Sequence, residues 1–389
     1  MKVLFDNLGF EDQAFGGVTR YFTEIIRHFP AEIETLLPVI ETANVYLQAA
    51  PFRIPAARWS FQQYFPRTHF RGKHLSFKIL SRLISPFAEG CEIKNRRRFL
   101  ELLAKDDFDV LHLTRAHMYG RDWMPAVGKK PIVVTIHDLI PDKIQGLKRF
   151  QRERRRILPF VTRFIAVSEN TKSDLVDEYG VDPDLIDVVY HGPSEILPTT
   201  SANLPALPPH YILFVGGRGG YKNFGFFAKS IAPWLRNRPS MKLVCTGAPF
   251  TPSERKMLAD AGVLGLCEAR FFPNEELPSL YEHAFAFVFP SVYEGFGIPI
   301  LDAFRAGCPV LLNRASCFPE IGGDAALYFA DGNEESLVRQ LDRLESEPEL
   351  RKELREKALQ RVKAFSWAKA AKETARSYRK ALDSFRALH

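Results

Sequence analysis

Short apolar runs alternate with amphipathic segments over nearly the whole chain, and the runs consist almost entirely of Val, Ile, Leu, Phe and Ala. A run without polar alternation is typical of a parallel strand that helices cover on both faces. The segments between the runs repeat apolar residues at spacings of three and four, as Val18–Phe29 does, which predicts helices with one buried face. The runs that we interpret as strands are Lys2–Asp6, Ile33–Ile40, Phe108–Leu113, Pro131–Asp138, Phe164–Ser168, Ile186–Tyr190, Tyr211–Gly216, Lys242–Gly247, Ala269–Pro273, Ala284–Pro290, Pro309–Asn313 and Ala325–Phe329.

The alternation restarts once, after a stretch that has the composition of a linker. Residues 194–209 are rich in Ser, Thr and Pro and show no apolar periodicity. A chain of 389 residues also exceeds the size at which a single core usually stops growing. We therefore predict an α/β protein with two doubly wound, Rossmann-like parallel-sheet domains, 1–200 and 201–368. Residues 369–389 are expected to form a C-terminal helix that can return to the first domain.

Composition narrows the class of protein. Apolar residues make up 46% of the chain and charged residues 25%, as in an ordinary globular protein. No run of eighteen apolar residues occurs, and the first residues lack the apolar centre of a signal peptide. The five cysteines form no Cys-x-x-Cys pair, so we interpret them as reduced and the protein as cytoplasmic.

Positive charge is concentrated in two places. The net charge is +7, and residues 67–98 carry nine Lys or Arg residues, with aromatic residues in and just before this region. A second basic cluster covers residues 148–156. Such clusters fit an anionic membrane surface, a nucleic acid, or a solvated helix face. We favour peripheral contact of residues 67–98 with the inner face of the cell membrane and expect no nucleic-acid partner.

The loop that follows the apolar run Ala284–Pro290 carries the most specific chemistry. Glu294 precedes a glycine-rich turn that includes Gly297, and a helix is predicted to begin at Ile298–Pro299. Free N–H groups at a helix start bind anions such as phosphate, and Asp302 lies about one turn further along. An anion site between two acids suits a ligand with both a diphosphate and sugar hydroxyls. A surface loop with solvated acids is the simpler alternative.

Three other strand ends carry candidate residues, because ligands of doubly wound sheets bind where the strands end. Gly16 and Gly17 open a helix and can direct N–H groups at phosphate or an acceptor, or form only a tight turn. His137 ends a strand and can donate to a sugar hydroxyl or to developing charge, although a single histidine is often structural. Arg218 and Lys222 head a helix and can neutralise a departing pyrophosphate, or form a solvated basic turn. With two such domains, the expected reaction site is the cleft between them.

In combination these residues resemble the retaining glycosyltransferases of the GT-B fold. The most similar group is the large group 1 family, which includes bacterial mannosyltransferases of polysaccharide, O-antigen and lipopolysaccharide assembly. The resemblance covers most of the chain and is strongest in its second half. The segments that carry it, in family order, are Phe15–Tyr21, Thr135–Pro141, Ala166–Lys172, Val189–Gly192, Gly217–Asn223 and Glu294–Pro299.

The resemblance implies a fold and a first set of roles. It implies two Rossmann-like domains that face a central cleft, the first on the acceptor side and the second binding the nucleotide sugar. Arg218 and Lys222 would hold the donor diphosphate, together with the backbone at Gly16 and Gly17.

The resemblance also implies which residues meet the sugar and the ribose. Glu294 and the N–H groups of Phe296 and Gly297 would hold the hydroxyls of the donor sugar. His137 would contact that sugar near its reactive carbon, so His137 and Glu294 are the candidate catalytic residues. Asp302 stands where the family usually has a ribose-binding glutamate, and its side chain is one methylene shorter.

The implied reaction transfers a hexose, mannose from GDP-mannose in the favoured case, to a lipid-linked or polysaccharide acceptor. The acceptor hydroxyl attacks from the face that the diphosphate leaves, without a covalent intermediate, while the protein positions the groups and stabilises charge. We expect no cofactor and no metal, because no His or Cys set in the sequence has ligand spacing. The alternatives are a UDP- or dTDP-sugar donor, an epimerase or phosphorylase on the same fold, and a non-catalytic sugar-nucleotide-binding protein.

Overall fold

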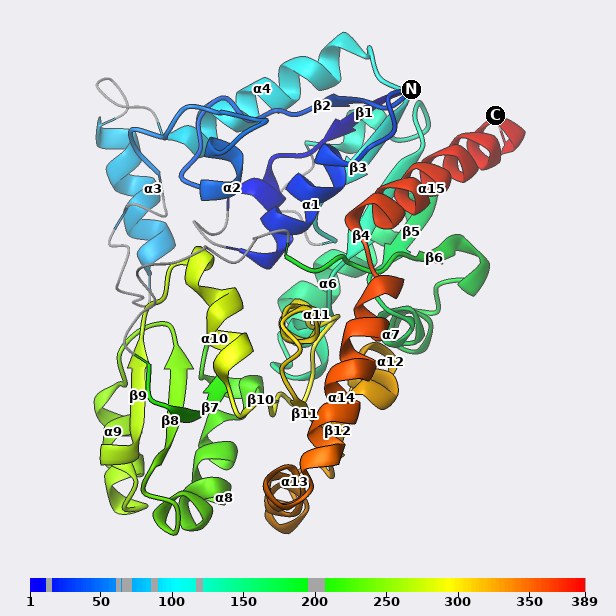
Figure 1. Cartoon of the computed structure of the whole chain (residues 1–389). Helices are drawn as coiled ribbons and strands as arrows, with labels where there is room; N and C mark the ends of the chain where they lie inside the picture. Colours follow the sequence, from blue (N-terminus) through cyan, green and yellow to red (C-terminus); the bar gives the residue numbers. More distant parts are fainter. Residues whose placement is uncertain are drawn as a thin grey trace. The chain divides into compact units, whose positions relative to one another are not determined.

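The computed structural model describes residues 1–11, 16–60, 64, 72–84, 90–116, 122–194 and 207–388. The chain forms two compact units, which can be followed by colour in Figure 1. Unit 1 contains Met1–Val167, Thr171–Val189 and Trp367–His389, and unit 2 contains Ser168–Asn170 and Tyr190–Ser366. Most of the predicted linker, residues 195–206, lies outside the described residues.

Unit 1 is built on a six-stranded sheet with strand order β2-β1-β3-β4-β5-β6, and every neighbouring pair is parallel. Each apolar run predicted as a strand in this half of the chain overlaps one of these strands, and β5 begins one residue before its predicted run. Most of their side chains are fully buried, as continuous Val, Ile, Leu and Phe runs require. The strands are β1 Lys2–Phe5, β2 Glu34–Leu36, β3 Val110–Leu113, β4 Ile132–Ile136, β5 Arg163–Ala166 and β6 Ile186–Val188.

The last helix of the chain packs on this sheet, although it comes from the opposite end of the sequence. Helix α15 contacts α1, β3, β4 and β5, and Tyr378 on α15 places its hydroxyl 2.6 Å from Nδ1 of His112 on β3. Burial lowers the pKa of the His112 imidazole to about 3, so the ring is neutral at physiological pH. Its hydrogen bond with Tyr378 links β3 to α15. The helices are α1 Gly17–Arg27, α2 Val45–Gln48, α3 Lys73–Ile84, α4 Cys91–Lys105, α5 Ile140–Lys143, α6 Lys148–Ile157, α7 Glu169–Tyr179, which begins in unit 2, and α15 Trp367–Leu388.

Unit 2 repeats this architecture with strand order β12-β11-β10-β7-β8-β9, again parallel throughout. Its third strand, β9, begins two residues before the predicted run at Ala269, because half-buried Cys267 and Glu268 pair with β8. The strands are β7 His210–Phe214, β8 Met241–Thr246, β9 Cys267–Arg270, β10 Ala286–Phe289, β11 Val310–Asn313 and β12 Leu327–Phe329. The helices are α8 Phe224–Arg236, α9 Pro252–Asp260, α10 Leu277–His283, α11 Ile298–Arg305, α12 Phe318–Gly322, α13 Glu334–Ser346 and α14 Pro348–Arg361.

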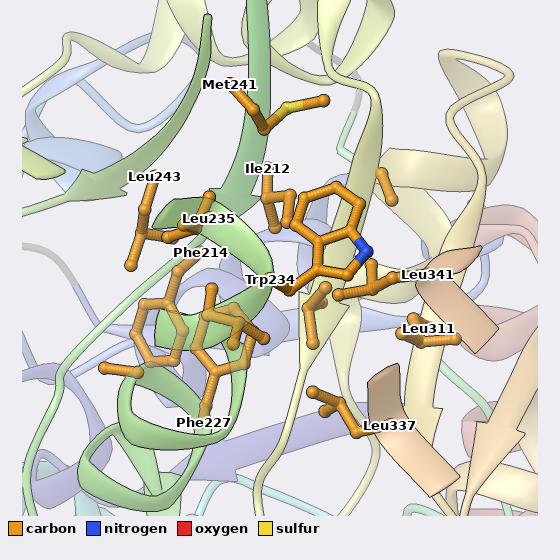
Figure 2. Packing of buried hydrophobic residues seen from close by; sticks show 14 of the residues in the cluster. Ile212, Phe214, Phe227, Trp234, Leu235, Met241, Leu243, Leu311, Leu337 and Leu341 are labelled. Atoms are coloured by element: carbon orange, nitrogen blue, oxygen red, sulfur yellow. The ribbon is translucent and has the colours of Figure 1, made fainter. Parts of the chain in front are cut away.

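The core of unit 2 forms where α8 and α13 cover the sheet (Figure 2). Trp234 on α8 is almost fully buried, and its indole N–H donates to Asp342 on α13 at 2.8 Å. Leu337 and Leu341, four residues apart on α13, point into the same cluster, as a helix with one apolar face predicts. The prediction of two doubly wound α/β sheets is therefore confirmed.

Strand order identifies where each sheet can hold a ligand. In unit 1 the chain proceeds from β1 outward to β2 and then continues on the other side at β3. In unit 2 it proceeds from β7 outward to β8 and β9 and continues on the other side at β10. The switch points therefore lie between β1 and β3 and between β7 and β10, and ligands of doubly wound sheets bind at the carboxyl ends of such strands.

Candidate functional site

The switch point of unit 2 brings two predicted site residues into direct contact. Lys222 ends the short 3-10 helix Gly220–Lys222 after β7, and Glu294 lies in the loop after β10. The Nζ atom of Lys222 is 2.6 Å from Oε1 of Glu294. The two loops are also joined through the backbone, since the N–H of Val292 donates to the carbonyl of Tyr221 at 2.9 Å. The topology, rather than sequence proximity, unites this lysine and this carboxylate.

The pair is partly shielded from solvent but still accessible. The side chain of Lys222 is 20% exposed and that of Glu294 11% exposed. Burial lowers the pKa of Lys222, but the attraction of the Glu294 carboxylate outweighs it, so the net pKa is raised and the ammonium is charged at neutral pH. The ammonium also lies 5.2 Å from the ring centre of Phe289. A ligand with a diphosphate and hydroxyls can therefore separate this ion pair: the diphosphate would bind the Lys222 ammonium, and the hydroxyls would donate to the Glu294 carboxylate.

Helix α11 begins directly after the glutamate loop. Its N-cap, Gly297, has φ 92°, in the left-handed region. A Cβ added there would lie 3.0 Å from Cδ1 of Ile300 and 3.5 Å from the ring of Phe289, so glycine is required by both conformation and space. The first N–H groups of α11 follow immediately, in the arrangement that binds anions.

Ser316 and Cys317, which the sequence analysis did not identify as site residues, fix the backbone of the glutamate loop. The Ser316 hydroxyl donates to the Glu294 carbonyl at 2.6 Å and accepts from the Glu294 N–H at 3.2 Å. The Cys317 thiol donates to the carbonyls of Glu294, at 3.3 Å, and Phe296, at 3.2 Å. Ser316 has φ 52°, an uncommon conformation for a serine. The available signal was topological: this segment follows β11, the strand next to β10.

Arg218 has its contacts on a different loop. Its Nε donates to Glu254 at 2.9 Å, and its Nη2 donates to the carbonyls of Ala248, at 2.8 Å, and Pro249, at 3.1 Å. The guanidinium also lies 5.0 Å from the ring centre of Phe250. Arg218, on the loop after β7, thus contacts the loop after β8 and the first turn of α9. Its role in holding a diphosphate remains a prediction.

Asp302 is engaged by the segment that precedes the linker. Its carboxylate accepts from the N–H of Ser194 at 2.6 Å and from the Ser194 hydroxyl at 2.5 Å. The guanidinium of Arg305 donates to the carbonyl of the same serine. A cavity of about 190 Å³ lies beside this cluster and is lined by Ser194, Leu277, Pro278, Tyr281, Glu282, Asp302, Arg305, Ala306, Arg355 and Leu359. The ribose contact of Asp302 remains a prediction.

In unit 1 the predicted histidine packs against the helix that the two glycines open. His137 follows β4, and its ring meets Tyr21 edge-on at 5.0 Å and Phe22 at 5.4 Å, both on α1. Gly16 is the N-cap of this helix and Gly17 its first residue. Asp138, next to the histidine, accepts from the N–H of Ile140 at 3.0 Å, and burial raises the pKa of its carboxyl group.

The switch point of unit 1 holds a buried carboxylate that the sequence analysis did not single out. Asp6 accepts from the N–H of Thr114 at 2.7 Å, from the Thr114 hydroxyl at 2.5 Å and from the N–H of Leu8 at 2.8 Å. It is fully buried, and burial raises its pKa to about 6 despite these three donors. Through its hydrogen bonds to Thr114, the carboxylate connects the end of β1 to the end of β3, which is a structural role.

Among the residues that the structure describes, no group of three or more His, Cys, Asp or Glu side chains could hold a metal ion. All five cysteines are free thiols. Within the same residues, no helix combines the length and apolar content that crossing a bilayer requires.

Comparison with known proteins assigns the family. The family described as "Glycosyl transferases group 1" matches residues 201–361, and "Glycosyltransferase Family 4" matches residues 15–193. A D-inositol 3-phosphate glycosyltransferase of Frankia alni is 30% identical over 310 residues, which cover 71% of this chain and 75% of that protein. The chain belongs to the group 1 glycosyltransferases. The predicted resemblance is thereby confirmed.

Other relatives of this glycosyltransferase include mannosyltransferases. An MMP alpha-(1->4)-mannosyltransferase of Mycolicibacterium hassiacum is 25% identical over 89% of this chain and 86% of its own length. An O-antigen chain mannosyltransferase of Salmonella typhimurium is 27% identical over 56% of this chain, and the match spans 61% of that relative, less than two thirds of its length. The structure of HepE from Anabaena in complex with UDP and glucose covers 96% of this chain and 98% of its own, with a TM-score of 0.70 at 12% identity, which shows that the glycosyltransferase has the GT-B fold.

Proposed function

We propose that this glycosyltransferase moves a hexose from a nucleotide diphosphate sugar to a saccharide acceptor, with the donor held by unit 2. The observation that carries the proposal is the Lys222–Glu294 ion pair, 2.6 Å long, at the switch point between β7 and β10. This is the position in a doubly wound sheet where a ligand binds. One partner is a cation suited to a diphosphate, and the other is a carboxylate suited to sugar hydroxyls.

Each side chain then has a separate role. The Lys222 ammonium neutralises the charge that grows on the diphosphate as its bond to the sugar carbon breaks. Glu294 accepts hydrogen bonds from hydroxyls of the sugar and fixes its orientation, while the N–H groups of Phe296 and Gly297 donate to the same sugar. Ser316 holds the backbone of Glu294 from both sides, at 2.6 Å and 3.2 Å, and so keeps the carboxylate in place.

The stereochemistry that we propose is retention. The acceptor hydroxyl attacks from the face that the diphosphate leaves, and an oxygen of the departing diphosphate takes the proton of that hydroxyl. This route balances without a covalent enzyme intermediate and needs no metal, because Lys222 provides the positive charge. His137 of unit 1 is proposed to donate to the sugar near its reactive carbon, with Arg218 and the Gly16–Gly17 backbone assisting at the diphosphate and Asp302 at the ribose.

We propose mannose from GDP-mannose as the donor substrate and a lipid-linked or polysaccharide chain as the acceptor. Support comes from the mannosyltransferases among the relatives, at 25% and 27% identity, one of which acts on the O-antigen chain. A UDP-sugar donor is the main competing outcome. Peripheral contact with an anionic membrane would bring the enzyme to a lipid-linked acceptor.

A thermal-shift series tests the donor site. We expect one nucleoside diphosphate of the set GDP, UDP, dTDP and ADP, with its sugar conjugate, to raise the Tm of the wild type, and Lys222→Ala to abolish that rise. Lys229→Ala is the matched control, since it removes the same charge from an exposed position on the neighbouring helix α8. Stabilisation by none of the four, or an unchanged shift in Lys222→Ala, would contradict the proposal. Formation of hexose 1-phosphate from a saccharide and inorganic phosphate, with no nucleotide sugar present, would instead indicate a phosphorylase.

A further inference from the structure

Helix α3 of unit 1, Lys73–Ile84, carries large apolar side chains that are exposed to solvent. Leu75 is 64% exposed, Ile79 52% and Leu83 69%. The spacing of four residues places the three side chains in one stripe along the helix. Among large apolar side chains in the described part of the chain, Leu83 is the most exposed of all. Such a stripe marks an interaction site.

The opposite side of the helix is anchored to unit 1. Phe77 stacks on Trp59 with ring centres 5.6 Å apart and planes 23° apart, and it lies 5.4 Å from the ring of Tyr64. Lys73 is buried, and Leu80 is half-buried. The helix is therefore apolar on two faces. One is covered by aromatic side chains of unit 1, and the stripe Leu75, Ile79 and Leu83 is presented outward.

Charge indicates what covers the stripe. Residues 73–84 include Lys73, Lys78 and Arg82 and contain no Asp or Glu. The sequence of residues 67–98 holds nine Lys or Arg residues and two acids, Glu89 and Glu92. Three of these cations pair with acids outside this range, Lys94 with Glu41, Arg96 with Asp122 and Arg98 with Glu101, so the region keeps a net positive charge of +4 after these pairs are counted. A second copy of the chain docked on the same stripe would bring two such regions together, at an electrostatic cost. A polyanion alone would satisfy the cations but leave the apolar stripe in water.

We propose that α3 docks on an anionic lipid bilayer, with Leu75, Ile79 and Leu83 inserted between the headgroups. The stripe covers nine residues and is about 12 Å long, so the helix lies parallel to the membrane plane. The acyl boundary takes the apolar side chains, and anionic headgroups are attracted by the net positive charge that the sequence carries in and around this helix. This inference is independent of the donor and of the transfer reaction, and its test uses no activity measurement.

Vesicle co-sedimentation of the full chain tests the proposal. The probes are extruded vesicles of phosphatidylethanolamine with about 3 parts in 10 of the anionic lipid phosphatidylglycerol, and vesicles of phosphatidylcholine alone. We expect binding to the anionic vesicles, binding at least about tenfold weaker to phosphatidylcholine, and loss on raising the salt concentration. Leu75→Ser/Ile79→Ser/Leu83→Ser should bind the anionic vesicles at least about tenfold more weakly, with a Tm close to the wild type because the three side chains are exposed.

The matched control replaces three exposed apolar residues elsewhere in unit 1: Ile40→Ser/Ile144→Ser/Leu147→Ser, at positions 46%, 42% and 40% exposed. We expect this variant to bind the anionic vesicles as the wild type does. Equal binding of the α3 variant, equal loss in the control, or no wild-type binding to anionic vesicles would overturn the proposal. A wild-type dimer in light scattering that the α3 variant abolishes would assign the stripe to self-association instead. If the triple variant fails to fold, the single variant Ile79→Ser replaces it, and weaker vesicle binding by that variant is the expected result. The dependence of wild-type binding on salt and on lipid charge is measured in either case.

Discussion

Both sheets are parallel and doubly wound, but the residues at their switch points differ in burial and in chemistry. In unit 1 the ends of β1 and β3 are joined by Asp6, a carboxylate with 0% exposure and three donors within 2.8 Å. In unit 2 the loops after β7 and β10 are joined by a backbone hydrogen bond from Val292 to Tyr221 and by the ion pair Lys222–Glu294, in which Lys222 remains 20% exposed. A fully buried and satisfied group is inert, whereas an accessible pair of opposite charges can be exchanged for a ligand. Both switch points can in principle hold a ligand, and the chemistry of the residues there is the reason that we propose unit 2 as the donor-binding unit.

Removing the cation of unit 2 should have the largest effect. We expect Lys222→Ala to lower kcat/KM for transfer by about 10² to 10³, because a charge that develops on the leaving diphosphate loses its counter-charge. Steady-state kinetics with the donor identified by thermal shift measure it. Lys229→Ala should stay within twofold of the wild type. A decrease in kcat/KM of less than fivefold in Lys222→Ala would contradict the proposal that the switch point of unit 2, unlike that of unit 1, binds the donor.

Neutralising the carboxylate of unit 1 should alter stability rather than catalysis. The folded pKa of Asp6, about 6, lies above its usual value of 3.8, so the folded state binds the proton more tightly and stability is lost as pH rises from about 4 to 6. Asp6→Asn lacks this titration. In urea unfolding, we expect the wild type to lose about 2 kcal/mol relative to Asp6→Asn over that range. If the free energy of unfolding depended on pH in the same way for both proteins, the pKa of Asp6 would not be raised in the folded state.

Loosening the glutamate loop of unit 2 sharpens the comparison. Ser316→Ala and Ser316→Gly both remove the hydroxyl that contacts Glu294, and each should lower kcat by about tenfold through misplacement of the carboxylate. Because Ser316 has φ 52°, the glycine variant should be about 1 kcal/mol more stable than the alanine variant. Urea unfolding and single-turnover kinetics separate the two effects. Full activity in both variants would show that the position of Glu294 does not depend on its hydrogen bonds with the Ser316 hydroxyl.

Arg218 should give the smallest effect of the cationic candidates. Its guanidinium is already engaged by Glu254 and by two carbonyls. We therefore expect Arg218→Ala to raise the KM for the donor by about three- to tenfold and to leave kcat nearly unchanged, as loss of ground-state binding does. A loss in kcat as large as that of Lys222→Ala would show that Arg218 leaves Glu254 for the diphosphate during the reaction.

The sequence predicted the architecture well because continuous apolar runs directly report strands that are buried on both faces. The twelve runs and the restart after residue 194 were enough for two doubly wound sheets. Lys222 and Glu294 were also predicted together, since each follows a strand and parallel strands end at one edge. Ser316 and Asp6 were missed because their roles depend on strand order: β11 beside β10, and β1 beside β3, are neighbours that no local pattern reveals.

The partners of Arg218 and Asp302 were equally hidden from the sequence. Each has a side chain suited to a nucleotide, but Glu254 and Ser194, which bind them in the structure, lie 36 and 108 residues away. Charge at a strand end predicts what a side chain can bind. It does not predict which intramolecular group competes for it.

The most direct test is calorimetric titration of the full chain with GDP and with GDP-mannose, or with the pair that the thermal-shift series selects. If the lysine holds the diphosphate and the glutamate holds the sugar, Lys222→Met should weaken both ligands by about 100-fold, whereas Glu294→Gln should weaken the sugar nucleotide and leave the nucleoside diphosphate within threefold of the wild type. Wild-type affinity of both variants for both ligands would contradict a donor site between β7 and β10.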